Sequence, residues 1–251
     1  MRVFLAGTDS HENMGWKELE EIRYVLLSFY AIRTGNPKTK ERIKRMNKEN
    51  FLLDSGAFTF MADFQKSKKK QNVNITQYVK KYIEFINEYD IKYFFEMDID
   101  IICGYEKVLE MRKQIEQGTR KRCIPVFHKS RGLEEWERMC QEYDYVAIGS
   151  MAEYKGREDV IKALVKIAAK YGTKVHGLGF TNSAHLDSIH FYSVDSTSWL
   201  TGGRFGAIHR FDGKKIIAQS FKDKRRKHYK ELDHHNLNEW IKFQEYAETN
   251  L

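Results

Sequence analysis

The chain has 251 residues, of which 41% are hydrophobic, a share that supports a sizeable core and excludes a disordered chain. Its 43 Lys and Arg residues outnumber 35 Asp and Glu, and the net charge of +8 favours polyanionic partners, nucleic acid above all. No apolar stretch approaches the length of a membrane span. The N-terminus turns polar at Thr8 and Asp9, too early for a signal peptide. We therefore expect a cytoplasmic protein with no membrane partner.

Short apolar runs alternate with amphipathic stretches, which predicts β-strands separated by α-helices. The predicted strands are, in chain order, Val3–Ala6, Phe51–Leu53, Tyr93–Met97, Cys123–Phe127, Tyr145–Ile148, Val175–Leu178, Phe191–Val194 and Phe205–His209. The predicted helices are Trp16–Ile32, Ile75–Tyr89, Tyr105–Gln117, Leu133–Glu142, Asp159–Tyr171 and Asn236–Ala247. Such alternation implies a parallel sheet with right-handed crossovers. Eight strands in about 250 residues predict an α/β fold of the (β/α)8 TIM-barrel type, and a doubly wound open sheet is the alternative.

Two basic runs, at residues 66–71 and 222–230, interrupt the alternation. Their cations include Lys68, Lys69, Lys70, Lys224, Arg225, Arg226 and Lys227. A charge run is usually a solvated surface, but two of them on a basic protein favour contact with the phosphates of a nucleic acid. No linker divides the chain, so we expect a single domain over residues 1–251 that ends in a basic segment and a helix at 222–251.

Polar residues and glycines follow nearly every predicted strand. In a β/α barrel these positions meet at the carboxyl ends of the strands, where the active sites of this fold lie. Carboxylates there accept hydrogen bonds from a ligand, and glycines let the main chain approach it closely. Several carboxylates at one barrel mouth suggest chemistry at a glycosidic carbon. The residues concerned are Asp54, Ser55, Gly56, Asp98, Asp100, His128, Gly149, Ser150, Gly177, Phe180 and Asp195.

The sequence carries no recognisable metal motif. Its 3 cysteines, Cys103, Cys123 and Cys140, are far apart and lack CxxC spacing, so we expect reduced thiols. His128 is a single strand-end histidine, and a metal-dependent site usually takes more ligands of this kind. We therefore expect neither a metal nor another cofactor.

Several segments are similar to motifs of the tRNA-guanine transglycosylases, the superfamily of queuine and archaeosine tRNA-ribosyltransferases. Residues 52–58 resemble the DSGGF signature of that family, residues 145–153 its base-binding AIGGL segment, and residues 176–179 its LMGVG segment. Asp195 precedes an arginine by nine positions and a glycine by eleven, as the nucleophile of the family does. Residues 211–214 match the short hairpin beyond it. The resemblance runs from about Val3 to Ile217.

Two departures from the tRNA enzymes point to one branch of the superfamily. No segment matches their CxCxxC…H zinc subdomain, and His128 stands where they have a base-reading glutamine. The chain is also much shorter. It is therefore most similar to the small phage-associated relatives, which exchange guanine in DNA for a 7-deazaguanine such as preQ0. If a phage encodes it, the protein is expected in the host cytoplasm.

The resemblance implies a base exchange through a covalent glycosyl-aspartate, with Asp195 as the nucleophile and Asp54 as the general base. It implies that Asp98 reads the N1/N2 edge of the purine, although Asp100 lies on the same side of an extended strand. Gly149 and Ser150 would bind the base through backbone donors. The remaining pocket residues would be Ser55, Gly56, Phe58, Asp100, His128, Gly177, Phe180 and Arg204. The target nucleotide would have to be flipped out or single-stranded.

Two alternative functions stay open. A transglycosylase that acts on tRNA would place labelled base in RNA and not in DNA. A hydrolase that breaks the glycosidic bond would release guanine without any incoming base. A non-enzymatic nucleic-acid-binding barrel is disfavoured, because carboxylates at its mouth would repel phosphate. The expected partners are therefore DNA first, tRNA second, and a 7-deazaguanine as the small-molecule substrate.

Overall fold

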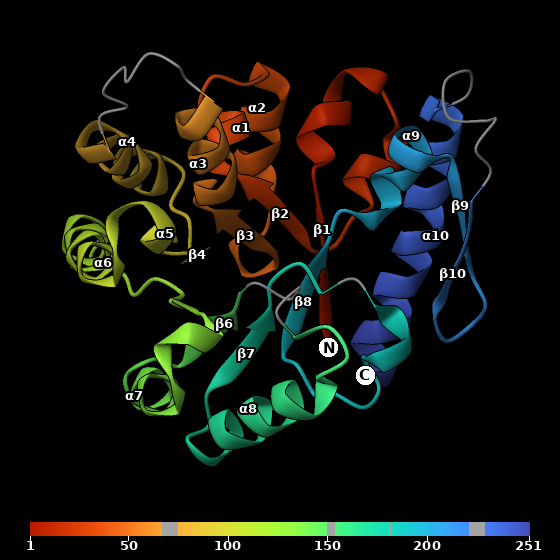
Figure 1. Cartoon of the computed structure of the whole chain (residues 1–251). Coiled ribbons are helices and arrows are strands. Elements are labelled where there is room, and N and C mark those ends of the chain that lie inside the picture. Colours follow the sequence, from red (N-terminus) through yellow and green to blue (C-terminus); the bar gives the residue numbers. More distant parts are fainter. Residues whose placement is uncertain (67–74, 150–153, 181, 221–228) are drawn as a thin grey trace. The chain divides into compact units, whose positions relative to one another are not determined.

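The computed structural model describes the chain except residues 67–74, 150–153, 181 and 221–228 (Figure 1). Within these residues the protein has an α/β fold with eight parallel strands, β1 to β8. It divides into two compact units: unit 1 comprises Met1–Val25 and Phe127–Leu251, and unit 2 comprises Leu26–Val126. Among the described residues, no helix is both long enough and apolar enough to cross a membrane.

Unit 1 holds the strands in the order β1-β8-β7-β6-β5. Their bounds are β1 Arg2–Ala6, β5 Val126–Phe127, β6 Tyr145–Ile148, β7 Lys174–Gly177 and β8 Ser193–Ser196. Every residue of β6 and β8 is buried, as expected of parallel strands that are covered on both faces. The helices α7 (Leu133–Glu142) and α8 (Glu158–Lys170) follow β5 and β6, and each buries one apolar stripe.

The C-terminal part of unit 1 forms a separate layer beside these strands. After β8 come α9 (Thr201–Phe205) and an antiparallel hairpin of β9 (Ala207–Phe211) and β10 (Ile216–Ser220). The long helix α10 (Tyr229–Asn250) packs on α9, β9 and β1. The buried Asn236 of α10 joins these elements, because its amide donates to the carbonyls of Trp199 and Ala207 and its oxygen accepts from the His209 N–H.

Unit 2 holds its strands in the order β4-β3-β2. Their bounds are β2 Val25–Ser28, β3 Phe51–Asp54 and β4 Tyr93–Phe94. The helices are α1 Phe29–Ile32, α2 Pro37–Arg45, α3 Ala57–Lys66, α4 Ile75–Glu88, α5 Asp100–Cys103 and α6 Tyr105–Thr119. The buried Tyr82 of α4 donates to the carbonyl oxygen of Phe95 at 2.9 Å and to that of Leu53 at 3.3 Å. Phe95 also forms a parallel bridge to Ile124, just before β5.

Two predicted elements were wrong. The segment Trp16–Ile32 was predicted as one helix, but it contains the 3₁₀ helix Lys17–Glu20, strand β2 and the short α1. A short buried apolar run cannot be assigned to strand or helix by periodicity alone. For Val25–Ser28, pairing with the neighbouring strands of the sheet determines the strand conformation. Phe205–His209 was predicted as the eighth strand of the parallel sheet, but it covers the end of α9 and the start of the antiparallel β9. The other seven predicted strands overlap β1 and β3 to β8.

Candidate functional site

Asp195, the predicted nucleophile, lies near the carboxyl end of β8 and its side chain is 10% exposed. Its Oδ1 accepts a hydrogen bond from the backbone N–H of Gly179 at 2.6 Å. The same oxygen lies 3.1 Å from Nε2 of His176. Gly179 has a φ of 70°, which an L-residue rarely adopts, and this turn after β7 directs its N–H at the carboxylate. Asp195 is therefore held through one of its two oxygens.

His176 lies in β7 with no exposed surface. The β7–β8 register pairs it with Ser193, and Ser193 and Asp195 share one face of β8 because they are two residues apart. His176 Nδ1 is 2.6 Å from Ser193 Oγ, which is 2.5 Å from the hydroxyl of Tyr145. A buried polar chain thus runs from Tyr145 to Asp195. His176 opens the segment that resembles LMGVG, but neither that resemblance nor its place inside an apolar strand predicts a contact with Asp195.

The other predicted pocket residues of unit 1 lie at or after the carboxyl ends of its strands. Gly149 follows β6, but its N–H donates to the Phe127 carbonyl at 2.9 Å. The predicted backbone donor at Gly149 is therefore wrong, because that N–H belongs to the sheet. Gly177 ends β7, where a Cβ would come within 2.9 Å of the Phe191 ring. Phe180 is 8% exposed and packs against Phe191 with ring centroids 5.3 Å apart.

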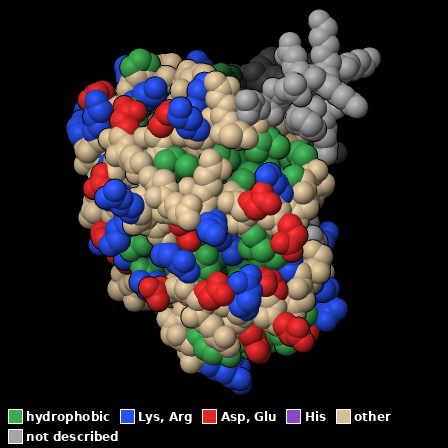
Figure 2. Space-filling model, turned by 90° about the vertical axis from the view of Figure 1, so that its left-hand side faces the viewer, with side chains coloured by type: hydrophobic (Ala, Val, Ile, Leu, Met, Phe, Trp, Pro, Cys, Tyr) green, Lys and Arg blue, Asp and Glu red, His purple; other side chains and the backbone are tan. Residues whose placement is uncertain are grey.

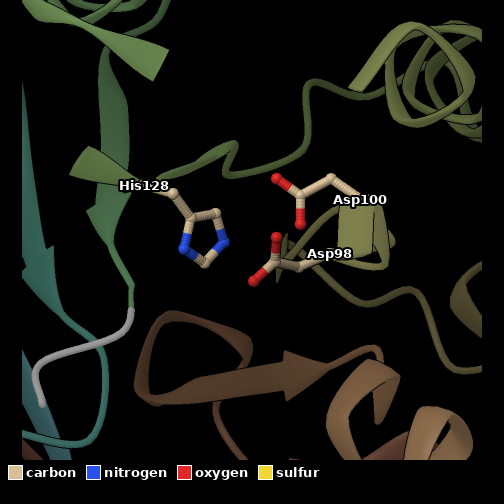
Figure 3. A group of neighbouring side chains, drawn as sticks. All are labelled: Asp98, Asp100 and His128. Atoms are coloured by element: carbon tan, nitrogen blue, oxygen red, sulfur yellow. The ribbon is translucent and has the colours of Figure 1, made fainter. Parts of the chain in front are cut away.

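Three more predicted residues of unit 1 have different settings. His128 follows β5 and is buried, with 8% of its surface exposed (Figure 3). Arg204 lies on α9 and is exposed. Ser150 lies outside the described residues.

In unit 2, Asp54 ends β3 and its Oδ2 accepts the N–H of Gly56 at 3.0 Å, which closes a tight turn. Gly56 has a φ of 75°, and a Cβ there would lie 2.3 Å from Cβ of Tyr30. Ser55 between them is 1% exposed, and its hydroxyl has no hydrogen-bond partner among the described residues. The turn thus buries a polar hydroxyl beside the predicted base. The side chain of Phe58, in α3, lies outside the described part of the chain.

Asp98 and Asp100 are also in unit 2, in the loop after β4 and at the start of α5. Both are half-buried, and Figure 3 shows their carboxylates side by side. A carboxylate oxygen of one lies within 4.8 Å of an oxygen of the other. Such a pair can accept two N–H groups of one planar ligand or contribute two oxygens to a cation. Ca²⁺ takes roughly six to eight oxygen ligands, so this pair alone does not make a metal centre.

Glu96, two residues before Asp98, was missed by the sequence analysis. It has no exposed surface, its Oε2 accepts from Arg112 Nε at 2.6 Å, and its Oε1 accepts from the Val126 N–H at 2.8 Å. Burial raises the pKa of Glu96 above its ordinary value, while the Arg112 charge opposes that shift. The only signal in the sequence was one acidic residue inside an apolar run. This buried pair anchors the segment that leads to Asp98.

The predicted phosphate contacts Lys68 to Lys70 and Lys224 to Lys227 lie outside the described residues. Figure 2 views the side on which α4 and α6 lie. There, Lys and Arg side chains are interspersed with Asp and Glu. Lys107 is paired with Glu110 on α6, and Lys80 lies 4.0 Å from Glu84 on α4. The described part of this side therefore carries charges of both signs.

Comparison with known proteins gives no family. No family model matches the chain, and no curated protein matches it. The chain is similar to solved structures of the carboxyl transferase domain from Rhizobium etli pyruvate carboxylase. For the structure with 3-hydroxypyruvate, the TM-score is 0.47 and the sequence identity is 13%; the match covers 98% of this chain and 47% of the solved chain. With pyruvate, the TM-score is 0.45 at 13% identity, covering 98% and 48%.

The chain therefore spans about half the length of the solved structures it matches. The class that the protein's own elements define is an α/β protein with eight parallel strands, whose order within each unit is that of a TIM barrel.

Proposed function

We propose that the protein is a base-exchange transglycosylase that replaces guanine in DNA by a 7-deazaguanine of the preQ0 type. The observation that carries the proposal is the setting of Asp195. Its Oδ1 is held by Gly179 and His176, while its Oδ2 accepts no hydrogen bond from any described residue. A carboxylate that is fixed through one oxygen presents the other to an electrophilic carbon.

The proposed reaction has two displacements at C1′ of the nucleotide. Asp195 Oδ2 forms a bond to C1′ while the bond to N9 of guanine breaks, and guanine leaves with the electron pair and takes up a proton from solvent. Asp54 then accepts the N9 proton of the incoming base and returns it to solvent, while N9 attacks C1′ and returns the electron pair to Oδ2. Asp98 or Asp100 would accept the N1 and N2 protons of either base.

We also propose that the eight strands close as a (β/α)8 barrel without the zinc subdomain of the tRNA enzymes. The sequential order of strands within each unit supports this closure. In unit 2, the Glu96 N–H donates to the Ile124 carbonyl, and the Ile124 N–H donates to that of Phe94. The segment after β4 thus pairs with the segment before β5, which a closed barrel requires.

The test is incubation with labelled guanine and with either DNA or tRNA, using wild type and Asp195→Asn. An asparagine keeps the oxygen that accepts the Gly179 N–H but is a poor nucleophile, so exchange should be abolished while folding and nucleic-acid affinity persist. Wild type should form a covalent adduct on denaturing gels that Asp195→Asn lacks. Asp187→Asn, an exposed site in the same unit, is the matched control and should remain active.

Each alternative predicts a different result. Faster incorporation into tRNA than into DNA would identify a tRNA enzyme. Guanine release without an incoming base would identify a hydrolase. An Asp195→Asn protein with full exchange would refute the nucleophile assignment.

A further inference from the structure

We infer that His176 is a positioning residue for Asp195, and that its Nε2–H makes the aspartate a good leaving group in the second half of the exchange. The inference rests on the proposed function. It concerns a residue to which neither the motif resemblance nor the strand-end pattern gave a role.

The direction of the hydrogen bonds around His176 follows from its neighbours. The Asp195 carboxylate only accepts, so the proton between it and the ring belongs to Nε2 of His176. A neutral imidazole with its proton on Nε2 accepts the hydroxyl proton of Ser193 at Nδ1, and Ser193 Oγ then accepts that of Tyr145. Each proton in the chain therefore points towards Asp195. The ring cannot rotate freely, because both of its nitrogens are bonded and no part of it is exposed.

The two donors on Oδ1 act differently on the two states of Asp195. In the free enzyme Oδ1 carries part of a negative charge, whereas in the glycosyl ester it is a neutral carbonyl oxygen. A hydrogen bond to a charged acceptor is roughly twice as strong as one to a neutral acceptor. His176 and Gly179 therefore stabilise the carboxylate more than the ester. They favour the step in which the Oδ2–C1′ bond breaks and the electron pair returns to Asp195.

This arrangement suits an exchange enzyme in particular. Base exchange must resolve the covalent intermediate with an incoming base, so a persistent ester would block turnover. The Gly179 N–H belongs to the main chain, and proline, which lacks this N–H, cannot adopt the φ of 70° found there; the His176 contribution can be removed by substitution. A merely structural histidine would fill the space beside Phe4, whose ring centroid is 6.1 Å from its own, and would affect folding alone.

The experiment compares His176→Leu and His176→Gln in the labelled-guanine exchange, with kcat, KM and the fraction of covalent adduct as readouts. Glutamine can place an amide N–H where the imidazole Nε2–H lies, whereas leucine fills the space without a donor. Thr173→Val is the matched control. It removes the 2.6 Å hydrogen bond from Thr173 Oγ1 to the Cys140 carbonyl, just before β7, and so loosens the same region away from Asp195.

The inference predicts that His176→Leu lowers kcat about tenfold or more with little change in KM, while the adduct accumulates. His176→Gln should recover most of kcat and lower the adduct again, and Thr173→Val should lower the melting temperature without raising the adduct. The inference is overturned if leucine and glutamine act alike, or if the adduct falls in step with kcat. A wild type that forms no adduct and exchanges no base would instead refute the proposed function itself.

Discussion

Replacement of Arg112 by methionine should destabilise the protein by about 3–5 kcal/mol at pH 7, because it leaves a buried carboxylate without its partner. The two side chains are nearly inaccessible: that of Arg112 is 4% exposed and that of Glu96 is not exposed at all. Methionine fills much of the volume of the arginine stem, so the loss reports mainly the charge. The Val126 N–H remains on the carboxylate but cannot replace a full positive charge.

The loss should depend on pH in a defined direction. Burial raises the pKa of Glu96 above its ordinary value of 4.5, and the Arg112 charge and hydrogen bond hold it lower than burial alone would. Without Arg112 the pKa of Glu96 should rise further. A carboxyl group with a raised pKa binds more protons in the folded state than in the unfolded state, so stability falls as the pH rises. The deficit of Arg112→Met should therefore shrink as the pH is lowered from 7 towards about 5.

Urea unfolding followed by circular dichroism measures this loss. Fluorescence is unsuitable because all 4 tryptophans lie in unit 1, whereas Arg112 and Glu96 lie in unit 2. The double variant Glu96→Gln, Arg112→Met is the control, since its amide still accepts the Val126 N–H and no charge is buried. It should be more stable than Arg112→Met at pH 7. A loss below about 1 kcal/mol at pH 7, the size of an exposed ion pair, or a deficit that grows on acidification, would refute the reasoning.

Three further predictions concern other parts of the chain. Burial lowers the pKa of His209 from 6.5 to about 4, so its neutral form stabilises the fold fully above pH 6.5. Up to about 3 kcal/mol of stability is lost as the pH falls from 6.5 through the folded-state pKa of about 4. Melting temperatures followed by fluorescence over this pH range should fall more steeply in wild type than in His209→Gln, and equal slopes would contradict the prediction. Gly56→Ala should lower the free energy of unfolding by at least about 2 kcal/mol, because its Cβ would lie 2.3 Å from Cβ of Tyr30. Gly15→Ala, at a position with a similar φ and open space, should lower it by about 1 kcal/mol. Equal melting temperatures of the two variants would refute the clash. Neutralising residues 224–227 should weaken binding to DNA of any sequence. It should also reduce the slope of log affinity against log salt concentration by about one unit per lost phosphate contact. An unchanged slope would show that these residues make no phosphate contact.

The alternation of strands and helices could be predicted because buried parallel strands are short, nearly continuous apolar runs. Tyr145–Ile148 is such a run, and all four of its residues are buried. Strand β2 could not be predicted in the same way. Its residues Val25, Leu26 and Leu27 sit among Ile22, Tyr24, Phe29 and Ile32, and this longer pattern also fits a helix. Its neighbours in the sheet, which lie outside this stretch of sequence, determine the strand.

In the candidate site, too, features that lie within one segment could be predicted from the sequence, and features that depend on the pairing of two segments could not. The position of Asp195 could be predicted because a carboxylate at the end of an apolar run is visible in one segment. The proposed role of His176 depends on two segments and on the register between them, which pairs His176 with Ser193. A slip of β7 by one residue would turn His176 to the opposite face and remove the donor from Asp195. The part of the candidate site that sequence alone cannot supply is therefore the hydrogen bond between His176 and Asp195, because it depends on how two separate strands pair.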